Sequence, residues 1–102
     1  MIFDAVLSQA AETFLLALEP PEREECYQVL LDVLCLDPYP DGVSKVELPF
    51  PYAPGTIGYA HGQFWFAYVI LNAACIAVAA IYWSPASPKH PVNQRPRPGS
   101  GE

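Results

Sequence analysis

The chain has 102 residues, of which 52% are hydrophobic, so it predicts one small domain with a real core and excludes wholesale disorder. Eleven acidic residues against five basic ones give a net charge of -6. The excess is larger over residues 1–84, where ten acidic residues stand against two basic ones, and the other three basic residues fall within residues 85–102. Because affinity for DNA or RNA comes largely from Lys and Arg that neutralise phosphates, this charge argues against nucleic-acid binding.

The three cysteines indicate reduced thiols. There is no Cys-x-x-Cys pair and no secretory signal at the N-terminus, so we expect a cytoplasmic protein. Cys26 and Cys35 are nine residues apart on a predicted helix, which places them on opposite faces and beyond the reach of a disulfide. Buried, reduced thiols are therefore expected.

The first half of the chain predicts two antiparallel helices. Residues 1–6 are mostly apolar and fit either a short strand or the lead-in to a helix. Ser8 is a suitable N-cap, and apolar residues then recur at helical spacing as far as Leu18. Prolines at positions 20 and 21 end this helix, and the second of them can begin another helix that runs to Leu36.

The second half predicts strands. Residues 37–55 form a loop rich in proline and glycine, with at most a short strand at 44–48. Aromatic and β-branched residues bounded by turn residues then predict three consecutive antiparallel strands, at 56–60, 63–71 and 75–83. Both faces of the middle strand are apolar, so one face can pack on the helices while the other needs a separate cover.

The predicted fold class is therefore α+β, a helix hairpin packed on a small antiparallel sheet. The domain is expected to span residues 1–84. Residues 85–102 contain five prolines and almost no apolar side chains. This composition predicts a disordered, proline-rich C-terminal tail.

One alternative for residues 64–83 stays open. These twenty residues carry no charge and a single amide, Asn72, so they are long enough and apolar enough for a transmembrane helix. Lys89 and the two arginines beyond it would hold the C-terminus on the cytoplasmic side, and the chain would be a small single-span membrane protein. The polar turn candidate at the centre of the segment favours strands instead.

The order of elements and several short motifs resemble the RelE/ParE superfamily of bacterial type II toxins. Residues 34–42 (LCLDPYPDG) are similar to the family pattern Leu-x-x-Asp-Pro-x-x-x-Gly, and residues 45–48 (KVEL) to Lys-x-x-Leu. Residues 62–68 (GQFWFAY) resemble the family's sheet hairpin, and residues 76–81 (IAVAAI) resemble its last strand. The resemblance implies a toxin fold whose apolar surface is covered by a small antitoxin-like protein.

The basic residues of the family's ribonuclease members are missing. In those members, Arg and Lys on the strands hold mRNA in the ribosomal A site and stabilise the transition state of cleavage. The matching positions here are uncharged: Gly58 or Ala60, Trp65, and Trp83 or Ser84. Because such a transition state needs donors or cations aimed at it, we expect no ribonuclease activity and assign no catalytic residue.

The function expected from the resemblance is protein–protein binding, with an antitoxin-like partner. Self-association is also expected, because an uncovered apolar strand face favours it. No cofactor or metal is expected, since turn chemistry accounts for Asp37 and Asp41, and His61 reads as a solvated turn residue. The predicted partner-binding residues are Phe64, Trp65, Phe66, Tyr68, Tyr82 and Trp83.

Overall fold

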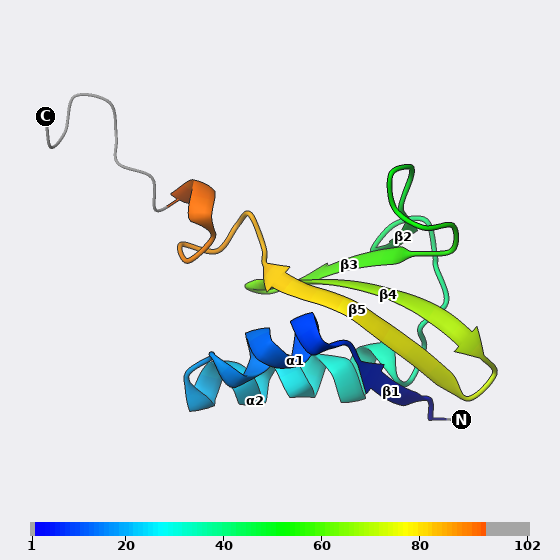
Figure 1. Cartoon of the computed structure of the whole chain (residues 1–102), viewed down its shortest axis with the longest axis horizontal. Helices are drawn as coiled ribbons and strands as arrows, with labels where there is room; N and C mark the ends of the chain where they lie inside the picture. Colours follow the sequence, from blue (N-terminus) through cyan, green and yellow to red (C-terminus); the bar gives the residue numbers. More distant parts are fainter. Residues whose placement is uncertain (1, 94–102) are drawn as a thin grey trace, which may run out of the picture.

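The computed structural model describes residues 2–93, and in it the apolar segment 64–83 folds back on itself as two paired strands (Figure 1). β4 (Phe64–Asn72) and β5 (Cys75–Trp83) are antiparallel along nearly their whole length. The alternative of a transmembrane helix at 64–83 is therefore wrong. Within the described part of the chain, no helix is both long and apolar enough to span a bilayer.

The sheet has five strands in the order β1-β5-β4-β3-β2, with β1 at Asp4–Leu7, β2 at Lys45–Glu47 and β3 at Ile57–His61. The three antiparallel strands expected in the second half are confirmed. β1 adds a parallel neighbour to β5, so the sheet is mixed and not wholly antiparallel. Because no short turn joins β1 and β5, no hairpin constraint sets their relative direction, and the four residues of β1 do not reveal it.

Two helices cover one face of the sheet, as predicted. α1 spans Gln9–Leu16, and the Ser8 hydroxyl oxygen accepts a hydrogen bond from the Ala11 amide at 3.1 Å, which confirms the predicted N-cap. α2 spans Pro20–Val29 and continues into a π-helical segment, Leu30–Leu34. Its Arg23 side chain donates to three carbonyl groups near the end of α1, those of Leu15, Leu16 and Leu18. This contact fixes the turn between the two helices.

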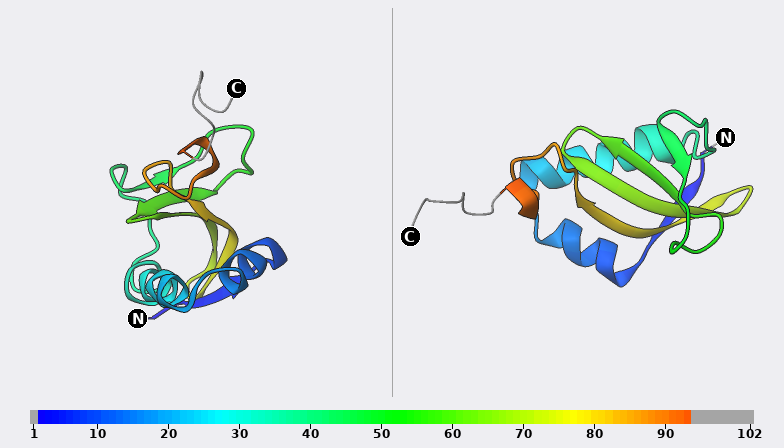
Figure 2. Two further views of the ribbon diagram at one scale, coloured as in Figure 1. Left: turned by 90° about the vertical axis from the view of Figure 1, so that its left-hand side faces the viewer. Right: turned by 90° about the horizontal axis from the view of Figure 1, so that it is seen from above.

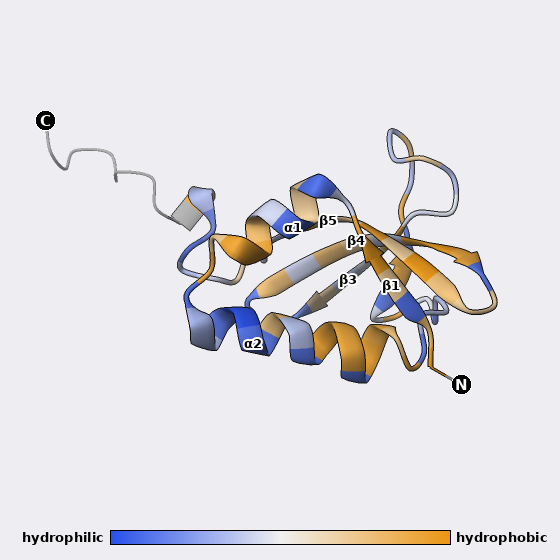
Figure 3. Cartoon of the chain, turned by 60° about the horizontal axis from the view of Figure 1, so that its bottom comes forward, coloured by the Kyte–Doolittle hydropathy of each residue, from blue (hydrophilic) through white to orange (hydrophobic). Residues whose placement is uncertain are grey.

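The core lies between the helices and the face of the sheet turned toward them, which we call the inner face. Figure 2 shows the sheet curving, so that β1 lies beside the helices while β3 lies away from them. Figure 3 shows hydrophobic residues along the ends of both helices and along the β4–β5 hairpin. Fully buried residues from both layers meet there, among them Leu15, Leu34, Phe66 and Ile76.

The described part of the expected tail contacts the domain. The Ser84 amide donates to the Gln63 carbonyl at 2.7 Å, and the Ser87 side chain is buried. Lys89 forms an ion pair with Glu22 of α2, and a 3-10 turn follows at Pro91–Asn93. Residues 85–93 thus contact the domain in this structure, residues 94–102 lie outside the described part of the chain, and the disorder of the tail stays a prediction.

Candidate functional site: the aromatic outer face of the sheet

Strand alternation separates the predicted partner-binding residues into two groups. Phe64, Phe66 and Tyr68 point to the inner face, and each is 0% exposed. The Tyr68 hydroxyl donates a 2.6 Å hydrogen bond to the Pro38 carbonyl, which ties β4 to the loop after α2. In this structure the chain already buries these three side chains, so they belong to the core and form no free surface for the predicted partner.

Trp65 and Tyr82 lie on the opposite face, which we call the outer face. They are directly opposite each other in the β4–β5 register, and their rings stack with centroids 5.8 Å apart. Tyr82 is 54% exposed, and Trp65 is half-buried. An aromatic pair across two strands stabilises the hairpin and still leaves aromatic surface exposed to a partner.

Trp83 has a mixed position at the end of β5. It is opposite Phe64 in the register and stacks on that ring with centroids 5.3 Å apart. It also packs edge-on against Phe14 of α1, and the Lys89 ammonium lies 5.3 Å from its centroid. Trp83 is therefore partly a structural residue that closes one end of the core, although its side chain also reaches the outer cavity described next.

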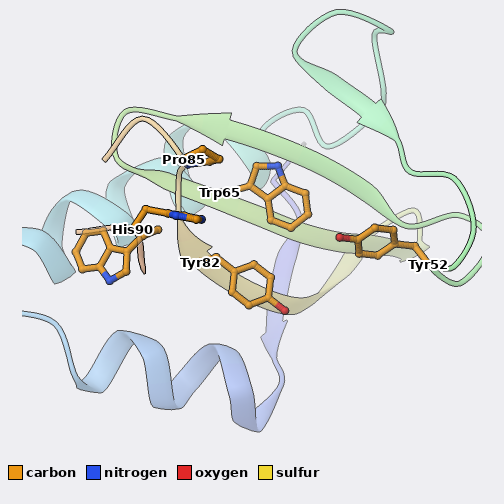
Figure 4. A pocket seen from close by; sticks show the side chains of 6 residues that line it. Tyr52, Trp65, Tyr82, Pro85 and His90 are labelled. Carbon is orange, nitrogen blue, oxygen red and sulfur yellow. The ribbon is translucent and has the colours of Figure 1, made fainter. Parts of the chain in front are cut away.

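A cavity of about 220 Å³ opens on the outer face (Figure 4). Its floor is formed by the stacked rings of Trp65 on β4 and Tyr82 on β5. The loop between β2 and β3 contributes one wall, where the Tyr52 and Trp65 ring centroids are 6.4 Å apart, and the segment after β5 contributes the other. The residues that line it are Tyr52, Trp65, Tyr82, Trp83, Pro85 and His90.

Three of these lining residues were missed from the sequence. Tyr52 lies in the proline-rich loop, and Pro85 and His90 lie in the segment that was assigned to a disordered tail. The periodicity of the sequence does not predict that these residues line the cavity, because they lie in loops and not on a strand. Only the proximity of their segments to the hairpin in the folded chain brings them together.

A second, wider hollow lies between α1 and β5. Tyr82 belongs to both hollows, and it is exposed between them. The other residues that line this second hollow are Gln9, Ala10, Thr13, Phe14 and Ile81. Tyr82 is therefore the side chain through which a partner on the outer face could also contact α1.

Two of the positions that the resemblance matches to basic residues, Gly58 and Trp65, lie in apolar packing. A side chain added at Gly58 would place its Cβ 2.9 Å from Leu48 Cδ2 and 2.9 Å from Trp65 Cζ2. Trp65 and Leu48 thus fill the space above β3. Ser84 is buried and its amide is bonded to the Gln63 carbonyl.

Each of the three cationic side chains within residues 2–93 is engaged inside the chain. Arg23 caps the end of α1, as described above. Lys45 is only 8% exposed, and its ammonium lies 5.7 Å from the Tyr59 ring centroid. Lys89 pairs with Glu22 and lies over Trp83. Against these stand ten acidic residues in the same range.

Asp41 belongs to a turn, as predicted. Its carboxylate accepts hydrogen bonds from the amides of Val43, Ser44 and Lys45 and from the Ser44 hydroxyl. These bonds, led by the one from Lys45, hold the pKa of Asp41 well below its usual range. In the part of the chain that the structure describes, no group of three His, Cys, Asp or Glu side chains is arranged to hold a metal ion.

The other polar candidates also have structural surroundings. His61 ends β3, and its Nδ1 lies 2.8 Å from the Tyr59 hydroxyl. Cys26 and Cys35 are free and buried, as predicted, whereas Cys75 is half-exposed. Burial raises the pKa of Cys26 to about 12 and, together with Asp4, raises the pKa of Cys35. Such thiols are poor nucleophiles.

Comparison with known proteins supports the fold. No protein-family model and no curated protein matches the sequence. Among solved structures, a chain of the RelBE2 toxin–antitoxin complex from Mycobacterium tuberculosis matches with a TM-score of 0.69. The match is 14% identical and covers 82% of this chain and 93% of that chain. The fold is RelE-like. At this identity, the likeness shows the fold alone.

Proposed function

We propose that this chain is a cytoplasmic RelE-like toxin-fold protein that acts by binding an antitoxin-like partner protein, without cleaving mRNA. The observation that carries the proposal is the outer face of the sheet, where Trp65 and Tyr82 present an aromatic surface that the chain's own helices do not cover. Aromatic side chains of this kind are enriched among residues that dominate binding energy. The solved structure with the similar fold is itself part of a toxin–antitoxin complex, which supports a partner of the same class.

The absence of ribonuclease activity is proposed on electrostatic grounds. Stabilising the charge of a phosphoryl transition state requires cations or donors aimed at it. The three described cations are engaged elsewhere, and Leu48 and Trp65 fill the space beside Gly58. A polyanion such as mRNA would also meet a net negative charge.

The proposal is tested by co-expressing the chain with the product of the gene next to its own. We expect the two proteins to elute as one complex in size-exclusion chromatography, and we expect the chain alone to be less soluble or to arrest growth. Light scattering on the chain alone measures self-association, which the same outer face would support. Failure of the two proteins to co-elute would contradict the proposed partner.

A separate assay tests the expected lack of activity. The purified chain is incubated with mRNA, alone and with ribosomes, and cleavage is followed by primer extension. We expect no cleavage above a buffer control. Cleavage that co-purifies with the protein and is lost when Tyr82 is replaced would show that the argument from missing cations is wrong.

A further inference from the structure

We propose that the cavity on the outer face, between Tyr52, Trp65 and Tyr82, binds an extended peptide segment of a partner protein that contains proline and carries positive charge. The inference rests on the proposed function in one respect, because it takes the outer face as a protein-binding surface. It goes further by assigning a chemistry to the segment that enters the cavity.

The shape of the cavity fits proline. Proline-rich segments adopt the polyproline II conformation and dock into grooves between aromatic rings, because the ring of proline packs flat on an aromatic face. Here Trp65 stacks on Tyr82 and lies beside Tyr52, so three aromatic rings from three separate elements surround one hollow. Figure 4 shows that Pro85 of the chain itself belongs to the lining of the same cavity.

The charge of the domain fits a cationic segment. Residues 2–93 hold ten acidic and three basic residues, a net charge of -7, and the three basic residues are engaged in internal contacts. The Lys89 ammonium lies 5.3 Å from the ring centroid of Trp83, one of the residues that line the cavity, so the chain already makes a cation–aromatic contact with a lining ring. The long-range field therefore attracts cations and repels polyanions.

The polar atoms of the cavity fit a peptide backbone. A polyproline II segment has no internal hydrogen bonds, so its carbonyl groups need outside donors. The His90 Nδ1 accepts a hydrogen bond from the Val92 amide at 3.1 Å, which leaves the proton of the neutral ring on Nε2 as a donor. The indole N–H of Trp65 and the hydroxyl of Tyr82 belong to the same lining and can donate in the same way.

The experiment is a fluorescence titration of the full chain with a synthetic peptide of alternating arginine and proline. Three probes of equal length serve as controls: a peptide in which glutamate replaces arginine, a peptide in which alanine replaces proline, and a single-stranded oligonucleotide. We expect the arginine–proline peptide to bind at least about fivefold more tightly than either altered peptide. We also expect its affinity to fall as salt increases, because part of the attraction is electrostatic.

Matched variants locate the binding. Tyr82→Ala removes a ring from the cavity, whereas Tyr27→Ala removes a partly exposed tyrosine of α2 that lines a different groove. We expect Tyr82→Ala to weaken peptide binding by about fivefold and Tyr27→Ala to leave it unchanged. Equal weakening by both variants, or equal binding of the arginine and glutamate peptides, would overturn the proposal.

The chain's own residues 95–98 have the sequence Arg-Pro-Arg-Pro and could compete with the probe. The titration is therefore repeated on the double variant R95E/R97E. Peptide binding by either form supports the assignment, and absence of binding in both overturns it, as does preferential binding of the oligonucleotide. None of these readouts requires the antitoxin-like partner, so they fail or succeed independently of the co-elution experiment.

Discussion

The two faces of the β4–β5 hairpin are both apolar in sequence, but they have opposite surroundings in the fold. On the inner face, Phe66 and Tyr68 are completely buried beneath the helices. On the outer face, Tyr82 is 54% exposed and lies between two hollows. Alternation along a strand assigns each residue to one of two faces. Because both faces are apolar here, hydrophobicity alone cannot tell a core residue from a binding residue. The position of the helices decides it.

The largest difference between the faces should appear when one aromatic ring is removed from each. Phe66→Ala leaves a cavity in the core and is expected to lower the free energy of unfolding by about 3–5 kcal/mol. Tyr82→Ala removes a ring that already contacts water and is expected to cost about 1 kcal/mol or less. Urea denaturation followed by circular dichroism measures both. Similar losses for the two variants would erase the distinction between the faces.

A second comparison adds a methyl group to the outer face. Gly58→Ala brings a Cβ into the space that Leu48 and Trp65 fill, and it is expected to cost about 1–3 kcal/mol, as overpacking does elsewhere. Ala60→Ser lies on the same strand at an exposed position and is expected to change the free energy of unfolding by less than about 0.5 kcal/mol. If Gly58→Ala is tolerated as well as Ala60→Ser, the Trp65 side chain does not lie over β3.

The inner face also contains a buried polar contact. Tyr68→Phe leaves the Pro38 carbonyl without the 2.6 Å hydrogen bond it now accepts, and we expect a loss of about 1–2 kcal/mol. Tyr82→Phe on the outer face loses only a hydroxyl at an exposed position, so its expected change is close to zero. Thermal and urea unfolding of the two variants, side by side, check this difference.

The smallest expected effect on stability is that of Asp41, in the turn before β2 at the edge of the sheet, and it should depend on pH. The pKa of Asp41 is lowered in the folded chain by hydrogen bonds from the turn, so its contribution to stability is complete above its unfolded pKa of about 3.9 and is lost as the pH falls through the folded value. Asp41→Asn should therefore destabilise the protein near neutral pH, with a difference that shrinks in acid. Urea midpoints measured between neutral pH and strong acid test this. A difference that stays constant with pH would mean that the Asp41 charge is not what stabilises the turn.

The sequence predicts the elements of this fold well because their signals are local. The Ser8 cap, the two prolines between the helices and the alternation of the hairpin each depend on a few neighbouring residues. The parallel pairing of β1 with β5 is not predictable in this way, because residues 4–7 and 75–78 are brought together only by the whole domain.

The candidate site is only partly predictable for the same reason. Trp65 and Tyr82 are found by strand alternation, and the predicted pairing of strands then places them side by side. Phe64, Phe66 and Tyr68 were assigned to the partner because alternation defines two faces without saying which one the helices cover. Tyr52 and His90 depend on the paths of loops, for which the residues themselves carry no periodic signal.

The most direct test of the account is the dissociation constant between this chain and the product of its neighbouring gene, measured by calorimetry for the wild type, Tyr82→Ala and Tyr27→Ala. If the outer face is the binding surface, Tyr82→Ala weakens binding by about tenfold or more, while Tyr27→Ala stays close to the wild type. Undiminished binding by Tyr82→Ala, in a variant that remains folded, would contradict the assignment of the outer face to the partner.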